Sequence, residues 1–435
     1  MARFRRRTFV ALLVFTLFVF GTMMGLKTLT PADGFEESPL APGLERVDTR
    51  RPVSNSPILM LPPTLTKVPR AHLEGYPTPN YDLHIFYYAW YGNPTFDGRY
   101  LHWNHLLVRH WDPKVAASYS EGRHSPPEDI GSSFYPELGP YSSRDPHVIE
   151  QHMQQLRTAA VGVLVLSWHP SGLEDEEGEP GEDLVPTLLD AADRYRLKMA
   201  FHIEPYKGRN DRTVYENVKH LTDRYGSHPA FYKYKTSTGR LLPMFYVYDS
   251  YLTPPVSWAN LLTPSGSLSV RNTAYDGVFV GLVVEEKHKQ DVLESGFDGI
   301  YTYFASNGFS YGSSHQNWKS IKAFCDDSNL MFIPSVGPGY IDTQIRPWNN
   351  HNSRNRVSGK YFETALQAAL GVRPEIISVT SFNEWHEGTQ IESAVPKKAT
   401  QHSYLDYLPH KPDLYLTLSH KWAEQFRKEK EQWLM

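Results

Sequence analysis

The chain has 435 residues, with 44 basic and 48 acidic side chains and a formal net charge of −4. This near balance argues against a protein that binds nucleic acid by bulk electrostatics, which carries a strong basic excess. A mean hydropathy of −0.47 excludes a protein that crosses a membrane many times. Cys325 is the only cysteine, so a small secreted fold held together by disulfides is also excluded.

The N-terminal residues have the pattern of a membrane anchor. Residues 1–8 are rich in arginine, and residues 9–26 carry no charge. About 18 apolar residues is the lower limit for a helix that spans a bilayer. Because the basic flank stays in the cytosol, we predict a cytoplasmic tail at 1–8 and a signal-anchor transmembrane helix at 9–26. A cleaved signal peptide is the alternative, although its apolar core is usually shorter, about 7–15 residues.

Residues 27–80 contain ten prolines and show no helical or strand period. Such a composition is typical of a semi-rigid extended segment, so we predict a luminal stem over 27–80. Residues 81–435 then form the catalytic domain. The predicted topology is a single-pass type II membrane protein whose catalytic domain lies in the lumen.

Short apolar runs alternate with longer amphipathic segments through this domain. The apolar runs predict eight strands, at residues 84–90, 161–168, 198–204, 243–248, 277–283, 299–303, 330–335 and 376–381. Nearly continuous apolar runs are typical of parallel strands that are buried on both faces. The amphipathic segments predict a helix opening at Asp145-Pro146 and helices at 184–195, 213–225, 286–295, 317–327, 361–370 and 414–432.

This alternation predicts an α/β fold, a (β/α)8 TIM barrel. An open doubly wound sheet is the alternative. That fold normally carries a Gly-rich phosphate loop after its first strand, whereas the loop here reads YGNPTFDG.

Aromatic and polar side chains gather where the predicted strands end, and active sites of barrels lie at that face. The strand ends contribute Trp90, Tyr91, Trp168, His169, Glu204, Tyr301, Tyr340 and Arg346. Tyrosine and tryptophan also close barrels by packing, which is the alternative for each residue taken singly. Carboxylates combined with many aromatic rings at one rim indicate a site for sugars.

Glu384 and Glu387 follow the eighth predicted strand and are three residues apart, so both can project toward one point. Two carboxyl groups are the minimum set for glycoside hydrolysis. An isolated pair with this spacing is more often a solvated surface pair, but its place after the last strand favours catalysis. His386 between them does not complete any zincin pattern, so we predict no metal and no cofactor.

At this point several long motifs resemble one known family. The segments FNEWHEGTQIE, YYAWYGNP, LSWHPSG, FHIEPY and PSVGPGYIDTQIRPWN are similar to those of the Golgi endo-α-1,2-mannosidases of glycoside hydrolase family 99. The similarity runs from about residue 81 to the C-terminus, and the basic N-terminus resembles the endomannosidase-like branch of vertebrates. The resemblance implies a (β/α)8 barrel in the Golgi lumen. It implies a retaining enzyme that cuts an internal α-1,2-mannosidic bond of glucosylated high-mannose N-glycans.

The resemblance also implies roles for single residues. Glu384 matches the carboxylate that takes a proton from the substrate's own 2-hydroxyl, which then forms a 1,2-anhydro sugar. Glu387 matches the general acid and later base. The substrate-binding candidates are Glu204, Trp168, Tyr301, Asn383, Tyr88, Trp90, Tyr91, His169, Tyr340 and Arg346. His169 departs from the family pattern, in which we associate tyrosine with that position, and this puts the subsite preference in doubt.

Two other functions remain open from the sequence. A paralogue that binds glycans without cleaving them is compatible with the same residues. A Golgi glycosyltransferase shares the predicted anchor and stem, but the chain has no Asp-x-Asp motif for a metal-bound sugar nucleotide. The sequence does not indicate the oligomeric state or the preferred number of capping glucoses.

Overall fold

The strands form one closed barrel. The computed structural model describes residues 73–173, 181–400 and 402–433. In this part of the chain the sheet has the order β8-β7-β6-β5-β3-β2-β1-β10-β9, with parallel pairing along that path. The first and last strands of the path are β8 (Met331–Ile333) and β9 (Ser335–Val336), which only Pro334 separates. Because proline cannot donate to a strand ladder, it divides one strand in two, and the sheet closes on itself.

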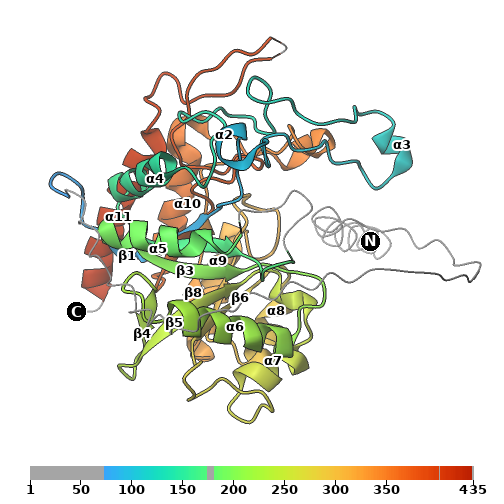
Figure 1. The fold of residues 1–435 in the computed structure, drawn as a ribbon. Helices are drawn as coiled ribbons and strands as arrows, with labels where there is room; N and C mark the ends of the chain where they lie inside the picture. The colour runs from blue at the N-terminus through green and yellow to red at the C-terminus, as the bar shows by residue number, and fades with distance from the viewer. Residues whose placement is uncertain (1–72, 174–180, 401, 434–435) are drawn as a thin grey trace, which may run out of the picture.

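Helices surround these strands (Figure 1). The remaining strands are β1 (Asn80–Tyr87), β2 (Val161–Trp168), β3 (Lys198–Ile203), β4 (Lys233–Lys235), β5 (Leu241–Val247), β6 (Val278–Leu282), β7 (Gly299–Tyr301) and β10 (Ile377–Val379). The α-helices are α2 (Pro94–Asp97), α3 (Pro113–Ala116), α4 (Pro146–Thr158), α5 (Leu184–Arg194), α6 (Asp211–Tyr225), α7 (Pro255–Leu262), α8 (His288–Ser295), α9 (Trp318–Asp327), α10 (Lys360–Leu370) and α11 (Leu414–Trp433).

The predicted (β/α)8 barrel is confirmed, and each predicted strand overlaps an observed one. The prediction for β2 is correct at both ends, because its eight residues are almost all buried and apolar. The predicted end of the first strand was wrong: β1 ends at Tyr87 and not at Trp90. The backbone N–H of Tyr88 donates to Asn383 Oδ1 at 2.8 Å instead of to a neighbouring strand. Tyr88 and Trp90 therefore lie in the loop above the barrel.

Four short elements, α2, α3, β4 and α7, were not predicted from the sequence. β4 pairs antiparallel with the start of β5 and reads KYK, too short and too charged for a strand signal. α7 begins at Pro255, directly after Pro254, and two consecutive prolines in the sequence indicate a loop. Proline is tolerated at the first helical position because the N–H there has no partner within the helix. The predicted cap of α4 is confirmed, since the Asp145 side chain accepts from the backbone N–H of His147 at 2.8 Å.

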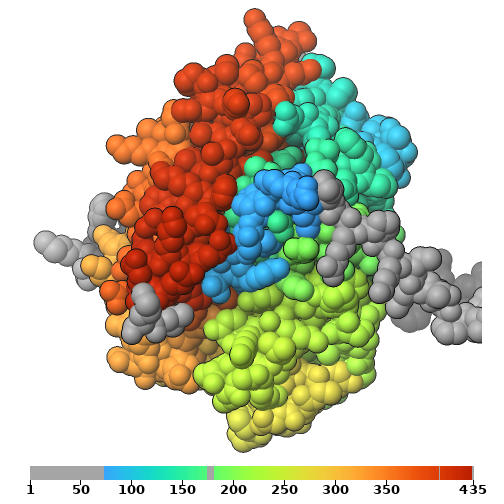
Figure 2. Space-filling view, turned by 90° about the vertical axis from the view of Figure 1, so that its left-hand side faces the viewer, coloured from blue at the N-terminus to red at the C-terminus, as the bar shows by residue number. Residues whose placement is uncertain are grey.

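The two ends of the described chain lie side by side (Figure 2). The Asn80 side chain donates to the carbonyl of Ala423 in α11 at 2.9 Å, and Arg427 donates to the carbonyl of Thr78 at 3.0 Å. Lys430 forms an ion pair with Asp82 at 2.8 Å. α11 thus fixes the point where the chain enters the barrel, at the N-terminal end of β1.

The predicted anchor at 9–26 and the stem as far as residue 72 lie outside the described residues. Within the part of the chain that the structure describes, none of the helices combines the length and the apolar character needed to cross a membrane.

Candidate active site

The segment between β10 and the C-terminal region carries the two predicted catalytic glutamates. We call residues 380–392 the β10 loop. Its start is fixed by hydrogen bonds: Phe382 N–H donates to the carbonyl of Phe86 at 2.8 Å, and Glu384 N–H donates to Ser381 Oγ at 2.8 Å. Gly388 has φ of +59°, and a Cβ there would lie 2.8 Å from the carbonyl oxygen of Ile341. Only glycine fits directly after Glu387, so the β10 loop can pack closely against the backbone of Ile341.

Glu384 is buried at the rim of the barrel, with 6% of its surface exposed. Its Oε1 accepts a hydrogen bond from the backbone N–H of His386 at 3.0 Å. Burial, followed by repulsion from Glu387, raises the pKa of Glu384 well above its ordinary value. A carboxyl group deprived of water favours the proton over the charge.

Glu387 lies at the end of a hydrogen-bonded chain formed by Arg346, Asp342 and Tyr340. Arg346 Nη1 is 3.6 Å from Glu387 Oε1 and 3.1 Å from Asp342 Oδ2. Tyr340 donates its hydroxyl to the same Asp342 oxygen at 3.0 Å. Burial raises the pKa of Glu387 to about 7, although Arg346 acts in the opposite direction. Glu387 is therefore protonated below about pH 7, as a general acid needs to be.

The two carboxyl groups hold at least one proton between them at neutral pH, because burial and repulsion raise both pKa values. Of these two carboxyl groups, only that of Glu387 forms an ion pair with Arg346, so the charge is favoured on Glu387 and the proton on Glu384. The family resemblance implies the opposite distribution, with the proton on Glu387 as the acid and the charge on Glu384 as the base. Contacts with the substrate would have to move the proton from Glu384 to Glu387. Pairs of acids with separated pKa values are the usual basis for dividing acid and base functions.

A third carboxylate, Glu204, follows β3. Its Oε1 lies 3.1 Å from His202 Nδ1. Burial raises the pKa of Glu204, but His202, His169 and Ser167 outweigh burial and keep the pKa below its ordinary value. Glu204 is therefore charged where the other two acids retain a proton. It can bind a hydroxyl or a developing positive charge.

Tyr88 links these acids in space. Its hydroxyl forms a short hydrogen bond with the hydroxyl of Tyr303, which lies two residues after β7. Burial is the main cause of the high pKa of Tyr88, and Glu204, Glu384 and Glu387 all raise it further. All three carboxyl groups therefore lie close enough to Tyr88 to influence its pKa, as expected for a single site at the C-terminal ends of the strands.

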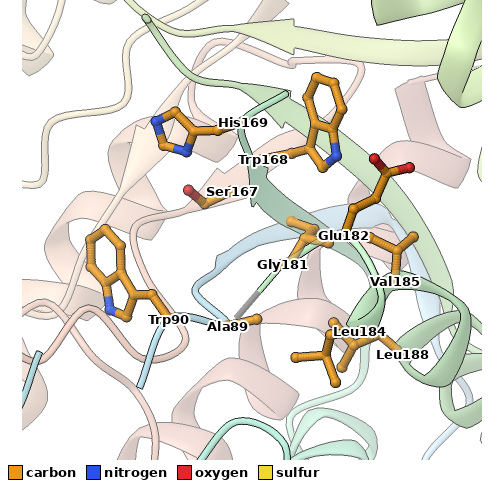
Figure 3. A pocket seen from close by; sticks show the side chains of 11 residues that line it. Ala89, Trp90, Ser167, Trp168, His169, Gly181, Glu182, Leu184, Val185 and Leu188 are labelled. Carbon is orange, nitrogen blue, oxygen red and sulfur yellow. The ribbon is translucent and has the colours of Figure 1, made fainter. Parts of the chain in front are cut away.

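A hollow of about 450 Å³, including its open mouth, lies beside the end of β2. We call it the tryptophan hollow; Trp90, Trp168, His169 and Glu182 line it. Figure 3 shows Trp168 and Glu182 on one side of the hollow and Trp90 on the other. Trp90 stacks on His102, with ring centroids 4.5 Å apart. Aromatic faces and a carboxylate around a concave surface suit a sugar ring.

A second hollow, of about 500 Å³ including its open mouth, is lined in part by Glu387. We call it the Glu387 hollow; its lining includes Tyr248, Tyr303, Phe309, Tyr340 and Arg346. The structure thus brings Tyr340 and Arg346 to Glu387 and gathers Trp90, Trp168 and His169 in the other hollow.

Three predicted substrate-binding residues are fully buried, with their polar atoms bonded within the protein. Asn383 bonds both the N–H and the carbonyl of Tyr88, at 2.8 and 2.7 Å. Tyr91 donates its hydroxyl to the carbonyl of Asn383 at 2.8 Å. The hydroxyl of Tyr301 bonds His202 Nε2 at 2.7 Å. In the free structure these residues hold the rim in place and line neither hollow.

Sequence reasoning did not single out Asp342, which is fully buried and accepts from Tyr340, Arg346 and Asn349. It lies in a motif that was noted for its neighbours, and no sequence signal revealed that its carboxylate orients the arginine beside Glu387. Sequence reasoning also assigned no role to Asp249, which follows β5 and whose pKa burial raises to about 7. Among the described residues, no group of three or more His, Cys, Asp or Glu side chains could hold a metal ion.

Comparison with known proteins agrees with this geometry. The family model described as glycosyl hydrolase family 99 matches residues 78–428. The chain is 62% identical to a zebrafish (Danio rerio) protein named glycoprotein endo-alpha-1,2-mannosidase-like protein, over 100% of both chains. It is 59% identical to a Xenopus laevis glycoprotein endo-alpha-1,2-mannosidase, also over 100% of both chains.

A solved structure extends the similarity to the fold. The family 99 endo-alpha-mannosidase of Bacteroides thetaiotaomicron superposes with a TM-score of 0.75 at 45% identity, covering 81% of this chain and 100% of that chain. A family model that spans the whole barrel, full-length relatives and a matching structure lead to one conclusion. The chain belongs to glycosyl hydrolase family 99, a family of glycosidases.

Proposed function

We propose that this protein is a retaining endo-α-1,2-mannosidase that cuts inside the glucosylated arm of high-mannose N-glycans. The observation that carries the proposal is the pair of carboxyl groups on the β10 loop, Glu384 buried and Glu387 partly buried, whose pKa values are raised because both are largely removed from water. The names of the relatives support the bond that is cut, since they are endo-alpha-1,2-mannosidases. The aromatic lining of the tryptophan hollow supports a carbohydrate substrate.

In the proposed first step the substrate supplies its own nucleophile. Glu384 removes the proton of the 2-hydroxyl, and the resulting oxygen attacks the anomeric carbon of the same mannose. Glu387 donates its proton to the glycosidic oxygen, so the bond to the leaving mannose breaks. A 1,2-anhydro sugar and the shortened glycan result. Proton transfer from a positioned acid contributes about 10²–10⁴-fold to such a rate.

The second step reverses the proton transfers. Glu387, now ionised, removes a proton from water, which attacks the anomeric carbon and opens the three-membered ring. Glu384 returns its proton to the oxygen at carbon 2. Two displacements at one carbon retain its configuration. Both carboxyl groups end in the protonation state in which they began.

The test is release of an oligosaccharide. Full-length protein in detergent solution is incubated with a glucosylated high-mannose N-glycan, and products are identified by mass spectrometry. We expect a glucose-capped mannose oligosaccharide, and NMR of fresh product should show the α-anomer. Binding of the glycan without release would favour the non-catalytic paralogue. Transfer from a sugar nucleotide would favour a glycosyltransferase.

We also propose that the protein is a Golgi membrane protein, anchored by residues 9–26 with the barrel in the lumen. The sequence pattern of the N-terminus supports this topology. The entry of the chain at the N-terminal end of β1 is compatible with it, because the β10 loop then lies at the opposite end of the barrel. Protease treatment of intact Golgi vesicles should leave the barrel uncut, and digestion without detergent would contradict the topology.

A further expected result concerns the pH profile. Arg346 lowers the pKa of Glu387 against the larger effect of burial. Without that cation, the pKa of Glu387 should rise by about one unit or more, as removal of a nearby opposite charge does. In Arg346→Met, the alkaline limb of kcat/KM should therefore move to higher pH. The measurement is kcat/KM between pH 5 and 9.

Arg427→Met is the matched control for the pH profile, because Arg427 pairs with Glu424 on α11 and donates to the carbonyl of Thr78, at the N-terminal end of β1. Its profile should equal that of the wild type. An alkaline limb that stays in place in Arg346→Met would show that Arg346 does not control the ionisation of the general acid.

A further inference from the structure

Glu392, at the end of the β10 loop, is a fully buried carboxylate that the proposed mechanism does not use. Its Oε2 accepts from the Tyr141 hydroxyl at 2.8 Å and from the Trp385 indole N–H at 2.9 Å. Its Oε1 lies 3.1 Å from His152 Nε2. A carboxylate is expensive to bury unless donors replace its water, and here they occupy both oxygens.

The hydrogen bonds continue beyond Glu392 into the barrel. His152, on α4, bonds the hydroxyl of Tyr87 through Nδ1 at 2.8 Å. With Nε2 as the donor to Glu392, Nδ1 accepts from Tyr87, so one neutral tautomer satisfies both partners. Tyr87 is the last residue of β1. A continuous chain of hydrogen bonds therefore runs from the barrel through α4 to the β10 loop.

The far end of this chain lies between the two catalytic glutamates. Trp385 directly follows Glu384, two residues before Glu387, and its side chain is fully buried. Tyr141, the second donor to Oε2, also lies 3.2 Å from Asn383 Nδ2. Glu392 thus holds both sequence neighbours of Glu384. It bonds Trp385 directly and Asn383 through the hydroxyl of Tyr141.

We propose that Glu392 is a positioning residue of the active site, which fixes the indole of Trp385 and through it the relative orientation of Glu384 and Glu387. It lines neither the tryptophan hollow nor the Glu387 hollow, so it acts only through the loop. The inference rests on the assignment of Glu384 and Glu387 as the catalytic pair. Displacing a catalytic group by about 1 Å can lower a rate by about 10²-fold.

The decisive variant is Glu392→Gln, which keeps the shape of the side chain. An amide has one acceptor oxygen, so its NH₂ group has to face either His152 or the pair formed by Tyr141 and Trp385. If it faces His152, that imidazole can move its proton to Nδ1 and accept. The variant should therefore fold, but its neutral amide oxygen holds Tyr141 and Trp385 less firmly than the carboxylate does, because hydrogen bonds to a charged acceptor are about twice as strong. We expect kcat to fall by about tenfold to a hundredfold and KM to change by less than about threefold.

A double-mutant cycle separates positioning from general structural support. Glu392→Gln is combined with Glu387→Gln and, separately, with Glu384→Gln, and turnover is measured on an activated glycosyl fluoride. If Glu392 acts through a catalytic carboxyl group, its effect should shrink when that group is absent. If Glu392→Gln lowers turnover by the same factor in the wild type, in Glu387→Gln and in Glu384→Gln, the proposal is wrong.

Asp276→Asn is the matched control. Asp276 is also buried and accepts from Arg240 and Arg271 at 2.9 and 3.3 Å, but it precedes β6, at the other end of the barrel. It should lower the melting temperature without changing kcat. A Glu392→Gln variant that behaves in the same way would reduce Glu392 to a structural role.

Tyr141→Phe keeps the test open if Glu392→Gln does not fold. It removes one donor to Glu392, and it should lower kcat by a smaller factor without a change in KM. Unchanged kcat in a folded Tyr141→Phe protein would then count against the proposal.

Failure of the proposed function gives a different result from failure of this inference. If the wild type releases no oligosaccharide, the proposed function is wrong. If the wild type is active and Glu392→Gln is unaffected, only the role of Glu392 is wrong.

Discussion

Glu387→Gln should slow release of the oligosaccharide from the natural glycan by about 10²–10⁴-fold, the usual contribution of a general acid. The amide cannot donate the proton that the leaving sugar oxygen needs. Glycan binding should change little, because glutamine keeps the shape of the side chain and a polar contact for Arg346, whose Nη1 lies 3.6 Å from the carboxylate. The measurements are single-turnover rates and binding affinity for the same glycan.

The leaving group provides the control for this result. In a glycosyl fluoride of the released oligosaccharide the leaving group departs without a proton. The first step, measured as fluoride release in a single turnover, should therefore stay within about tenfold of the wild-type rate in Glu387→Gln, although water attack in the second step still lacks its base. Equal losses on the glycan and on the fluoride would contradict the assignment of Glu387 as the acid that protonates the leaving group.

Protein stability gives an independent check that this variant is folded. The folded-state pKa of Glu387 is raised to about 7, so the contribution of its protonated form is complete below the ordinary value and is lost as the pH rises through 7. Glutamine does not ionise. The melting temperature of Glu387→Gln relative to the wild type should therefore be higher at pH 8 than at pH 5.

The fold could be predicted because its signal is local. β2 and β3 are continuous buried runs, and their predicted bounds agree with the structure to within one residue. The end of β1 could not be placed, because a side chain from the distant β10 loop, Asn383, ends its ladder. β4 has no apolar character, and it exists because β5 offers it an edge.

The site divides in the same way. Glu384 and Glu387 could be found because they follow a predicted strand in a long family motif. Burial depends on the tertiary structure, so the sequence could not show that the polar atoms of Asn383 and Tyr301 form hydrogen bonds within the protein. For the same reason it could not show that Asp342 orients Arg346, because three donors from its own loop converge on one oxygen only after folding.

Glu384→Gln should have an effect as large as that of Glu387→Gln, about 10²–10⁴-fold on the natural glycan, but with a different dependence on the leaving group. Without Glu384, no group removes the proton of the 2-hydroxyl, so the internal nucleophile does not form for any substrate. The glycosyl fluoride should therefore lose as much rate as the glycan. The measurement is the ratio of the two losses, with circular dichroism to verify the fold.

This ratio also decides how the proton is divided between the two acids. In the free site Arg346 favours the charge on Glu387, and burial with repulsion favours the proton on Glu384. The proposed roles require the substrate to reverse this preference, because a 2-hydroxyl beside Glu384 stabilises its ionised form by donating a hydrogen bond. If the fluoride instead restores activity to Glu384→Gln and not to Glu387→Gln, the substrate does not reverse it. Glu384 is then the acid, and Glu387, held by Arg346, is the base.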